Sequence, residues 1–399
     1  MHTHSVLQKF FTVSLPAVHA RRRDAVVAAV ESVAHGATVS ITAMGRGLPA
    51  ATRIKHRVKR MDRLIGNPRL QGERNQFYHA MILRLLAHSV QPIIVIDWSD
   101  FSVDRQQQWL RAALPVGGRD LTLYEELHPY AKLANRRVQH RFLDRLKALL
   151  PPDCTPIIVA DAGFRVPFFR YVEHLGWRWV GRIRNRDYVR WEGAPQDWVP
   201  AKSLYALATP RAQALGAAEW ARYAPWTGRL VLIRHPKQGR KDCTLGGSVR
   251  RSRLSRKHAQ QVRDPWLLIA AASLADLTPR QIVRLYKTRM QIEENFRDTK
   301  SLAYGLGIAR DRHTTLVRAT NLLLIAALAI FVLWMIGCLA QARHWDQAVR
   351  VNSSSQHADY SALTLARLVI HYLHERLSND CFDTAGQLAA DYFQSVLEI

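Results

Sequence analysis

The sequence is poor in cysteine, and this shortage excludes several classes of protein. Its four cysteines, among 399 residues, contain no CxxC pair and lie far apart, at Cys154, Cys243, Cys338 and Cys381. A disulfide framework or a cysteine-based zinc site is therefore not expected. No secretory signal opens the chain, so we expect a cytoplasmic protein.

Acidic residues are also scarce relative to basic ones. The chain has 57 Lys and Arg against 32 Asp and Glu, a formal net charge of +25. Such an excess indicates a polyanionic partner, because like charges repel one another in a compact state. Nucleic acid is the first candidate, since each neutralised phosphate releases counterions, and an anionic membrane is the second.

Long apolar runs are nearly absent, and the exception lies at residues 322–340. The stretch "LLLIAALAIFVLWMIGCLA" has 19 residues without a charge, which is long enough to span a bilayer. Basic residues flank it on both sides, so they give no clear orientation. We favour a helix buried on all sides in a soluble domain, and no membrane partner.

Residues 1–75 have apolar residues at helical spacing and predict a helical DNA-binding domain. Within it, "ATRIKHRVKRMDRLIGN" surrounds an apolar stripe of Ile54, Val58, Met61 and Leu64 with cations. A solvated surface helix is one interpretation. The other is a helix that docks on DNA after the "SITAMGRGL" helix and turn, in the manner of a helix-turn-helix. The candidate DNA-binding residues on it are Lys55, Arg57, Lys59 and Arg60.

Residues 76–186 predict the first part of a mixed α/β core. Short apolar runs at 92–100, 121–128 and 156–164 are typical of strands in one buried sheet, with a helix at 134–150. Residues 187–265 are rich in Trp, Gly, Pro and Arg and predict an inserted β-rich basic module. The core resumes over 266–343, and 344–399 predicts a separate helical C-terminal region.

Two of the predicted strands, "PIIVID" and "PIIVAD", end in an aspartate, at Asp97 and Asp161. In a parallel pair both carboxylates lie at the same edge of the sheet, where ligands of α/β sheets bind. A divalent cation with oxygen ligands, Mg²⁺ or Mn²⁺, would offset their repulsion. The alternative is that each aspartate only ends its strand, since Asp is frequent at turns.

A third carboxylate is expected on a helix that begins near Pro279 and runs through Lys300. If Tyr286 is the origin and each residue turns by about 100°, Arg289, Glu293 and Lys300 lie at about 300°, 340° and 320°. Glu294 lies at about 80° and misses this face. Glu293 is thus the candidate metal ligand, and the flanking cations would hold phosphates. A surface ion-pair ladder is the alternative.

These residues resemble a known family. The spacing Tyr286-x₂-Arg289-x₃-Glu293-x₆-Lys300 is similar to the Y-R-E-K signature of the cut-and-paste DDE transposases of the insertion-sequence four group. "DWSD", "DAGFRVPF", "LGWRWVGRIR" and "RMQIEENFRDTKSLAYGLG" resemble its transposon-ten branch, in the same order over nearly the whole chain. Motifs spread in this way are far more specific than an isolated tripeptide.

The resemblance implies a ribonuclease-H-like catalytic core with Asp97, Asp161 and Glu293 as its three acidic residues. It implies two Mg²⁺ ions per active site, for which Mn²⁺ would substitute, and double-stranded DNA as partner. By motif position it implies that Trp266 receives a base flipped out of the DNA; a core role is equally open. A homodimer on DNA, with the C-terminal region as a possible contact, rests on the same analogy.

The implied activity is excision of an insertion sequence at its terminal inverted repeats, with hairpin formation and joining of the 3′-OH ends to target DNA. The chain would then be a cytoplasmic, nucleoid-associated protein. Three alternatives are a structure-selective nuclease, a catalytically silent DNA-binding regulator and a membrane-attached basic protein. The acidic triad disfavours the regulator, and the Y-R-E-K helix disfavours the general nuclease.

Overall fold

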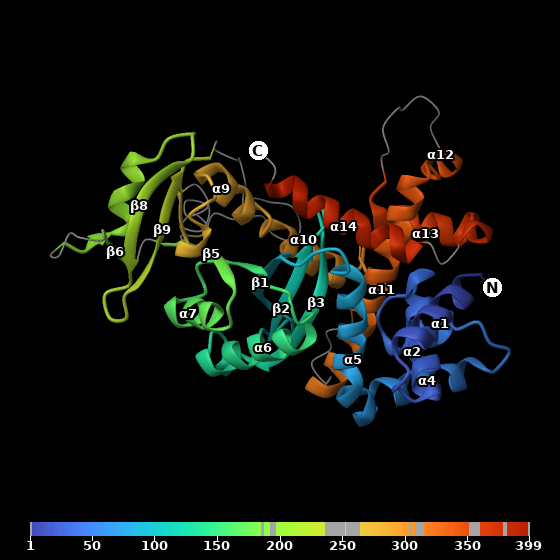
Figure 1. Cartoon of the computed structure of the whole chain (residues 1–399). Helices are drawn as coiled ribbons and strands as arrows, with labels where there is room; N and C mark the ends of the chain where they lie inside the picture. The colour runs from blue at the N-terminus through green and yellow to red at the C-terminus, as the bar shows by residue number, and fades with distance from the viewer. Residues whose placement is uncertain are drawn as a thin grey trace. The chain divides into compact units, whose positions relative to one another are not determined.

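The computed structural model describes residues 2–184, 187–191, 197–235, 252, 264–303, 305–308, 315–350, 360–377 and 381–397. The chain divides into two compact units, which are described one at a time (Figure 1). Unit 1 comprises Met1–Cys154 and Met290–Ser395. Unit 2 comprises Thr155–Arg289 and Val396–Ile399.

Unit 1 opens with helices, as the apolar spacing predicts. They are α1 (His2–Ser14), α2 (Ala20–Ala34), α3 (Ile41–Gly47), α4 (Ile54–Ile65) and α5 (Pro68–Leu85). The N-cap of α5 is Asn67, whose side chain accepts a hydrogen bond from the Arg69 backbone, and proline occupies the first turn. The domain boundary predicted at residue 75 falls inside this helix, which continues into the segment that leads to the first strand.

Helices α3 and α4 pack closely, in keeping with the predicted helix-turn-helix. A Cβ atom on Gly45 would lie 2.5 Å from the Cα atom of Val58, so only glycine permits this approach. The apolar stripe predicted for α4 is partly wrong. Met61 and Leu64 are buried, but Ile54 is 52% exposed, because it begins the helix beyond the reach of its neighbours.

The sheet of unit 1 is an antiparallel meander of β1 (Ile93–Asp100), β2 (Gln107–Pro115) and β3 (Asp120–Pro129). Helix α6 (Arg136–Leu149) follows, with Asn135 as N-cap. The sequence predicts β1, β3 and α6, but it does not predict β2. The reason is that the buried positions of β2 include Gln108 and Arg111, so the strand shows neither a continuous apolar run nor an alternation of apolar and polar residues.

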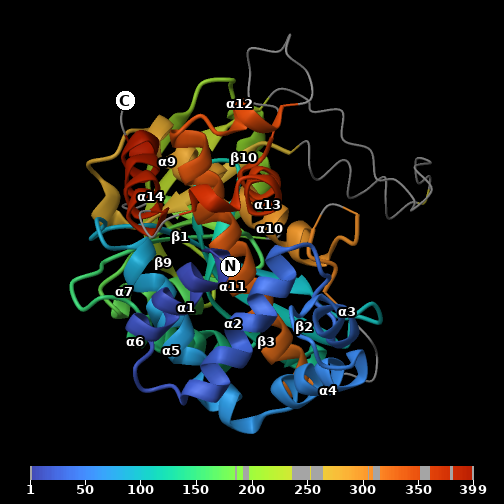
Figure 2. The ribbon, with the colours of Figure 1, turned by 90° about the vertical axis from the view of Figure 1, so that its right-hand side faces the viewer.

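The long apolar segment lies inside α11 (Leu316–Ala342). Among the described residues, α11 is the one helix with the length and composition to cross a membrane, yet its most apolar window is wholly buried within the protein. Helices α2, α5 and α13 (Ala362–Tyr372) and strand β3 surround it, and Figure 2 shows α2 close beside α11. This surrounding supports the interpretation as a core helix.

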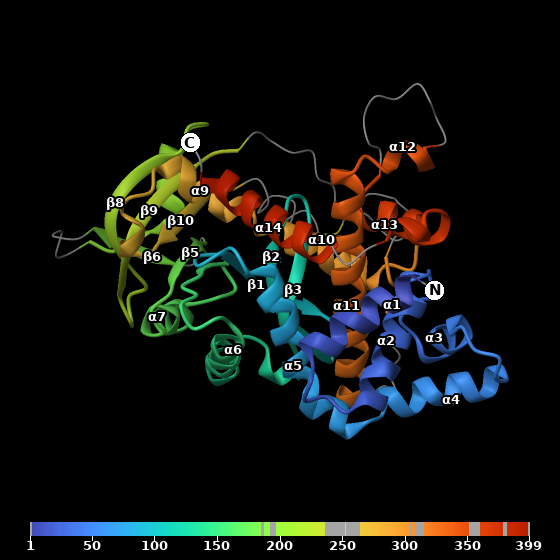
Figure 3. The same cartoon turned by 45° about the vertical axis from the view of Figure 1, so that its right-hand side comes forward.

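The rest of unit 1 is helical. It contains α10 (Met290–Lys300), the short α12 (Asp346–Val349) and α14 (Cys381–Leu397) besides α11 and α13. Helix α10 packs against all three strands of the meander, and Figure 3 shows α14 close to α10. The Gln291 side chain joins three parts of this arrangement. Its Oε1 accepts from the Val116 backbone at 3.2 Å, and its Nε2 donates to the Tyr392 hydroxyl at 2.6 Å.

Unit 2 begins with β4 (Ile157–Ala160), α7 (Val166–His174) and β5 (Arg178–Ile183), where β4 and β5 are parallel. Along the chain, β1-β2-β3-α6-β4-α7-β5 is the element order of a ribonuclease-H-like core, and the mixed α/β class is confirmed. The remaining helix of the described part of unit 2 is α9 (Pro279–Lys287).

The predicted insertion is β-rich but does not form a separate module. Its strands are β6 (Tyr188–Trp191), β7 (Val199–Pro200), β8 (Gln213–Trp220) and β9 (Trp226–Ile233). Strand β9 pairs with β10 (Trp266–Ala270), which pairs with β5, so the insertion extends the core sheet of unit 2. The predicted cationic loop is the run at residues 234–258 of this insertion, which is nearly devoid of acidic residues. Apart from Arg234, His235 and Ser252, it lies outside the described residues.

Candidate active site

Asp97 lies where β1 leaves the hydrophobic core. The preceding residues Ile93 to Ile96 are buried, whereas Asp97 is partly exposed. The Trp98 backbone N–H donates to Asp97 Oδ1 at 2.8 Å, which holds the carboxylate against its own strand. The buried part of the strand ends at Ile96, as the sequence predicts, but the prediction that Asp97 ends the strand itself is wrong, because β1 continues to Asp100.

Helix α10, which carries Glu293, lies on the face of the meander to which Asp97 points. Side chains two residues apart on a strand share a face, so Asp97 and Ser99 point the same way. Lys300 Nζ on α10 donates to Ser99 Oγ at 2.7 Å and to the Asp100 carbonyl. Because that contact is made on the Asp97 face, α10 covers this face of the meander.

The two adjacent glutamates of α10 have different surroundings. Glu294 forms an ion pair with Arg297 one turn further along the helix, and its side chain is 39% exposed. Glu293 belongs to the first turn and is exposed at the protein surface. The two side chains thus point in different directions from the helix, and Glu294 is engaged in an ion pair at the surface.

Asp161 directly follows the buried strand β4 in unit 2. Its Oδ1 accepts a hydrogen bond of 2.7 Å from the Gly163 backbone N–H. A Cβ atom on Gly163 would lie 2.8 Å from that same oxygen, so a side chain at this position would force the carboxylate to move. Phe164 next in the chain is fully buried and anchors the turn. The turn formed by "DAGF" thus holds this carboxylate through one backbone hydrogen bond and one buried aromatic ring.

The predicted helix from Pro279 to Lys300 is interrupted. The prediction that Tyr286, Arg289, Glu293 and Lys300 share one face of a single helix is therefore partly wrong. Helix α9 ends at Lys287 and α10 starts at Met290. The Thr288 hydroxyl donates to the Leu285 carbonyl at 2.7 Å, and the next backbone N–H groups bond three residues back. A hydroxyl that competes for a helix carbonyl tightens the turn. The face shared by Glu293 and Lys300 holds within α10, whereas Tyr286 and Arg289 precede α10.

Tyr286 belongs to an aromatic and cationic cluster in unit 2. Its side chain is only 2% exposed, and its ring meets that of Trp266 edge to face, with centroids 5.0 Å apart. On its other side, Trp266 contacts His235 at 4.1 Å, with the Arg182 guanidinium 6.0 Å from its ring. Tyr286 is thus a wall of the cluster, while Trp266 keeps partial exposure.

Arginines set the electrostatics of this cluster. Burial raises the pKa of Tyr286, while the positive charges of Arg289 and Arg182 oppose that shift. Burial lowers the pKa of the Arg182 guanidinium, and repulsion from Arg184 and Arg289 adds to this effect. Three arginines beside a partly exposed indole form a surface that suits a phosphate and a stacked base. Sequence reasoning missed Arg182 and Arg184, although "RWVGRIR" places cations at a strand end.

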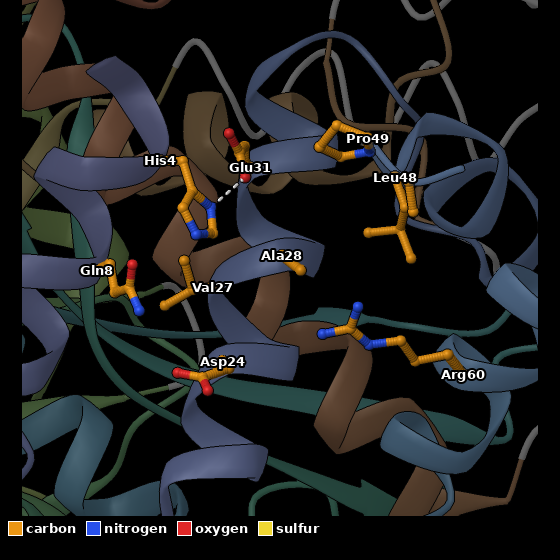
Figure 4. A pocket seen from close by; sticks show the side chains of 10 residues that line it. His4, Gln8, Asp24, Val27, Ala28, Glu31, Leu48, Pro49 and Arg60 are labelled. Carbon is orange, nitrogen blue, oxygen red and sulfur yellow. Dashed lines mark hydrogen bonds and ion pairs between the residues drawn. The ribbon is translucent and has the colours of Figure 1, made fainter. Parts of the chain in front are cut away.

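The basic residues predicted on α4 have different environments. Lys55 and Lys59 are exposed. Arg57 instead donates from Nη1 to the Leu48 carbonyl at 2.6 Å, so it braces the link between α3 and α4. Arg60 reaches from α4 toward α2, where it lines a cavity of about 220 Å³ together with Asp24 and Glu31 (Figure 4).

The carboxylates are suited to a divalent cation by their chemistry. Mg²⁺ is bound in proteins by one or two carboxylates, with water and phosphate oxygens completing its shell. Unit 1 contributes Asp97 and Glu293 to the predicted set, and unit 2 contributes Asp161. Among the described residues, no three His, Cys, Asp or Glu side chains are gathered closely enough to hold a metal ion.

Comparison with known protein families identifies the chain. A family model described as "Transposase DDE domain" matches residues 88–332, which is more than half of the sequence. The chain belongs to the DDE transposases. The matched region of this transposase includes β1 with Asp97, β4 with Asp161 and α10 with Glu293. It also includes the whole β-rich insertion and most of α11.

Among solved structures, the transposase is similar to the piggyBac transposase in its cryo-EM synaptic complex with hairpin DNA. The likeness covers 100% of this chain and 80% of that one, at 10% sequence identity and a TM-score of 0.41. No curated protein matches the chain.

Proposed function

We propose that this transposase is a cut-and-paste enzyme of the insertion-sequence four group, closest to its transposon-ten branch. The observation that carries the proposal is the placement of α10 on the Asp97 face of the meander, within the matched transposase domain. The Y-R-E-K spacing and the ordered motifs support the narrower assignment. Its substrates are the terminal inverted repeats of its own element and a target DNA.

Asp97, Asp161 and Glu293 would hold two Mg²⁺ ions, and Mn²⁺ would serve in their place. Bound ions of this kind activate an attacking oxygen and stabilise the leaving oxygen at phosphorus. The residues of the chain keep these carboxylates in place. The Trp98 and Gly163 backbone N–H groups each hold one aspartate oxygen, so the acidic groups meet the ions without reorganisation.

The DNA chemistry is a series of displacements at phosphorus, each forming one P–O bond and breaking another. Water first cleaves one strand and releases a 3′-OH. That 3′-OH attacks the opposite strand, which forms a hairpin on the element end and frees the flanking DNA. A second water opens the hairpin, and the resulting 3′-OH ends attack target DNA. One carboxylate set serves all steps because the geometry at phosphorus is the same.

The cations have separate roles in this proposal. Lys55, Lys59 and Arg60 on α4 contribute to end binding through phosphate contacts, and Arg57 holds that helix in place through the Leu48 carbonyl. Arg289, with Tyr286 as a wall of its site, holds DNA phosphates beside the flipped base that stacks on Trp266. Lys300 adds a positive charge near Asp97. Two end-bound copies would form a homodimer on DNA, in the cytoplasm at the nucleoid.

The test uses purified protein, Mg²⁺ and a plasmid that carries the DNA ends flanking the gene. We expect wild type and Glu294→Gln to cut at the ends and Glu293→Gln to lose cleavage by about 10³-fold or more, since a metal ligand is lost. A denaturing gel separates nicked, hairpin and blunt products. End binding by wild type without any cut would contradict the proposal and favour a silent regulator.

A further inference from the structure

The inner face of α10 is unusually polar for a buried helix surface. Asn295, Asp298 and Thr299 are buried there together with Ile292 and Phe296. Asn295 is 1% exposed and Thr299 is fully buried. The hydrophobic effect is non-directional, so by itself it would not fix the rotation of α10 about its axis or its position along the sheet. Directed hydrogen bonds to the meander therefore set the place of this helix.

Three charged residues lie in one row across the meander. In the strand register, Asp97 of β1 is opposite Arg111 of β2, and Arg111 is opposite Glu125 of β3. Directly opposed residues of an antiparallel pair project on the same face. The row therefore lies under α10 and includes one member of the proposed active site, Asp97.

Arg111 is the centre of this row and is completely buried. Its Nε and Nη2 atoms donate to Glu125 Oε2 at 3.0 and 2.8 Å. Its Nη1 atom donates to Asn295 Oδ1 on α10 at 2.6 Å. Glu125 also accepts from the Tyr78 hydroxyl and the Trp109 indole, so the carboxylate is fully engaged.

Aromatic rings fix the plane of the Arg111 guanidinium. It lies 3.9 Å from the Trp109 ring centroid and 5.1 Å from that of Phe296, which belongs to α10. The Asn295 amide is held from the other side, because its Nδ2 donates to the backbone carbonyl of Asp120 at 2.9 Å. The Arg111 guanidinium and the Asn295 amide are thus each held in one orientation, and so is the hydrogen bond between them.

A buried ion pair contributes little to stability, because the cost of desolvating two charges offsets their attraction. Apolar residues of similar volume would pack α10 at least as firmly. Arg111 instead fixes the relative positions of its two partners, since its planar guanidinium donates to both at fixed angles. One of these partners lies on the strand next to β2, and the other lies two residues after Glu293.

We propose that Arg111 is a positioning residue, whose link to Asn295 sets Glu293 relative to Asp97 for cation binding. The inference rests on the proposed function for the role of the two carboxylates. Arg111 touches neither DNA nor the reacting atoms in this view, and it acts through α10. A displacement of about 1 Å at a catalytic group can cost about 10²-fold in rate.

The test breaks the link from each side while Glu125 stays paired. Arg111→Lys keeps a positive charge for Glu125 but cannot hold both partners, and Asn295→Leu removes the acceptor and leaves the ion pair intact. Thr320→Val is the matched control, because its buried hydroxyl bonds the Leu316 and Val317 carbonyls within α11, at 2.9 and 2.8 Å. Melting temperature and end binding are measured on each full-length variant.

The deciding readout is Mn²⁺ binding to the DNA-free protein, followed by electron paramagnetic resonance. The signal lost in Asp97→Asn defines the site. We expect Arg111→Lys and Asn295→Leu to weaken Mn²⁺ binding at this site about 10-fold and cleavage by 10- to 100-fold, with end affinity unchanged. The double variant should be no worse than the poorer single variant, because both break one link. Thr320→Val should behave as wild type.

Folded Arg111→Lys and Asn295→Leu proteins with wild-type Mn²⁺ affinity would overturn the inference. If Arg111→Lys fails to fold, Asn295→Leu decides, since it leaves the Arg111–Glu125 ion pair intact. If wild type does not cleave, the proposed function is wrong, but the Mn²⁺ measurement still decides the role of Arg111.

Discussion

The Nζ atom of Lys300 lies 2.7 Å from the Oγ atom of Ser99, two residues beyond Asp97 on β1. This contact ties the last turn of α10 to the strand that carries the first acidic residue. The ammonium group also lies 5.6 Å from the Trp109 ring centroid, so aromatic faces stabilise its charge. A residue expected to bind phosphate is therefore also part of the scaffold.

Replacement of Lys300 separates these two roles. We expect Lys300→Met to lower cleavage and to reduce the slope of log affinity against log salt by about one, because one phosphate contact is lost. Binding to the element ends at several salt concentrations measures this slope. A normal slope with impaired cleavage would mean that Lys300 serves only to hold α10 on β1.

Gly163→Ala tests the turn that holds Asp161. The added methyl group would lie 2.8 Å from Asp161 Oδ1, so the carboxylate must rotate away from its position. We expect end binding to persist and cleavage to fall by about 10-fold or more, since misplaced catalytic groups are costly. Gly72→Ala in α5 is the control, because a Cβ there meets no atom within 4 Å. It should cleave normally and gain up to about 1 kcal/mol in stability.

The buried Asp120 should make the free energy of unfolding depend on pH. Burial raises the pKa of Asp120 to about 7 from 3.8, although Arg111 and a hydrogen bond from Asn295 act in the opposite direction; the nearby Asp298 and Glu125 add to the increase. In the unfolded chain the carboxyl ionises near 3.8, whereas in the folded chain it keeps its proton. The free energy of unfolding should therefore fall as pH rises from about 4 to about 7 and level off above that.

Asp120→Asn should remove this slope. We expect the variant to match wild type near pH 4 and to be more stable than wild type at pH 8, by an amount on the order of a few kcal/mol. Denaturant unfolding at a series of pH values measures the difference. A pH-independent difference between the two proteins would show that Asp120 does not titrate in this range.

Trp266 predicts a defect that is specific to one step. In the proposed pathway Trp266→Ala should nick the element end normally but form hairpins about 10-fold more slowly, because stacking offsets part of the cost of flipping a base. Trp266→Phe keeps an aromatic face and the packing against Tyr286, so it should retain most hairpin formation. Equal losses of nicking and hairpin formation in both variants would instead indicate a purely structural tryptophan.

The predictable parts of the fold have strong local signals. The runs that end in Asp97 and Asp161 are β-branched and apolar, and a Thr278–Pro279 pair starts α9 with a capping box. The uninterrupted helix through Lys300 was wrong, because the Thr288 hydroxyl bond to Leu285 depends on one rotamer that periodicity does not reveal. Strand β2 was missed because polar residues at its buried positions, Gln108 and Arg111, interrupt the apolar run that reveals a buried strand.

The sequence by itself determined the basic character of the protein, the types of its catalytic side chains and the order of the motifs that mark a DDE transposase. Local propensity and spacing along the chain are sufficient for these. Only the tertiary structure decided that α11 is a core helix and that Arg111 lies between Asp97, Glu125 and the helix of Glu293. Such relationships join residues as far apart as Arg111 and Asn295. They depend on strand register and packing, which no local pattern contains.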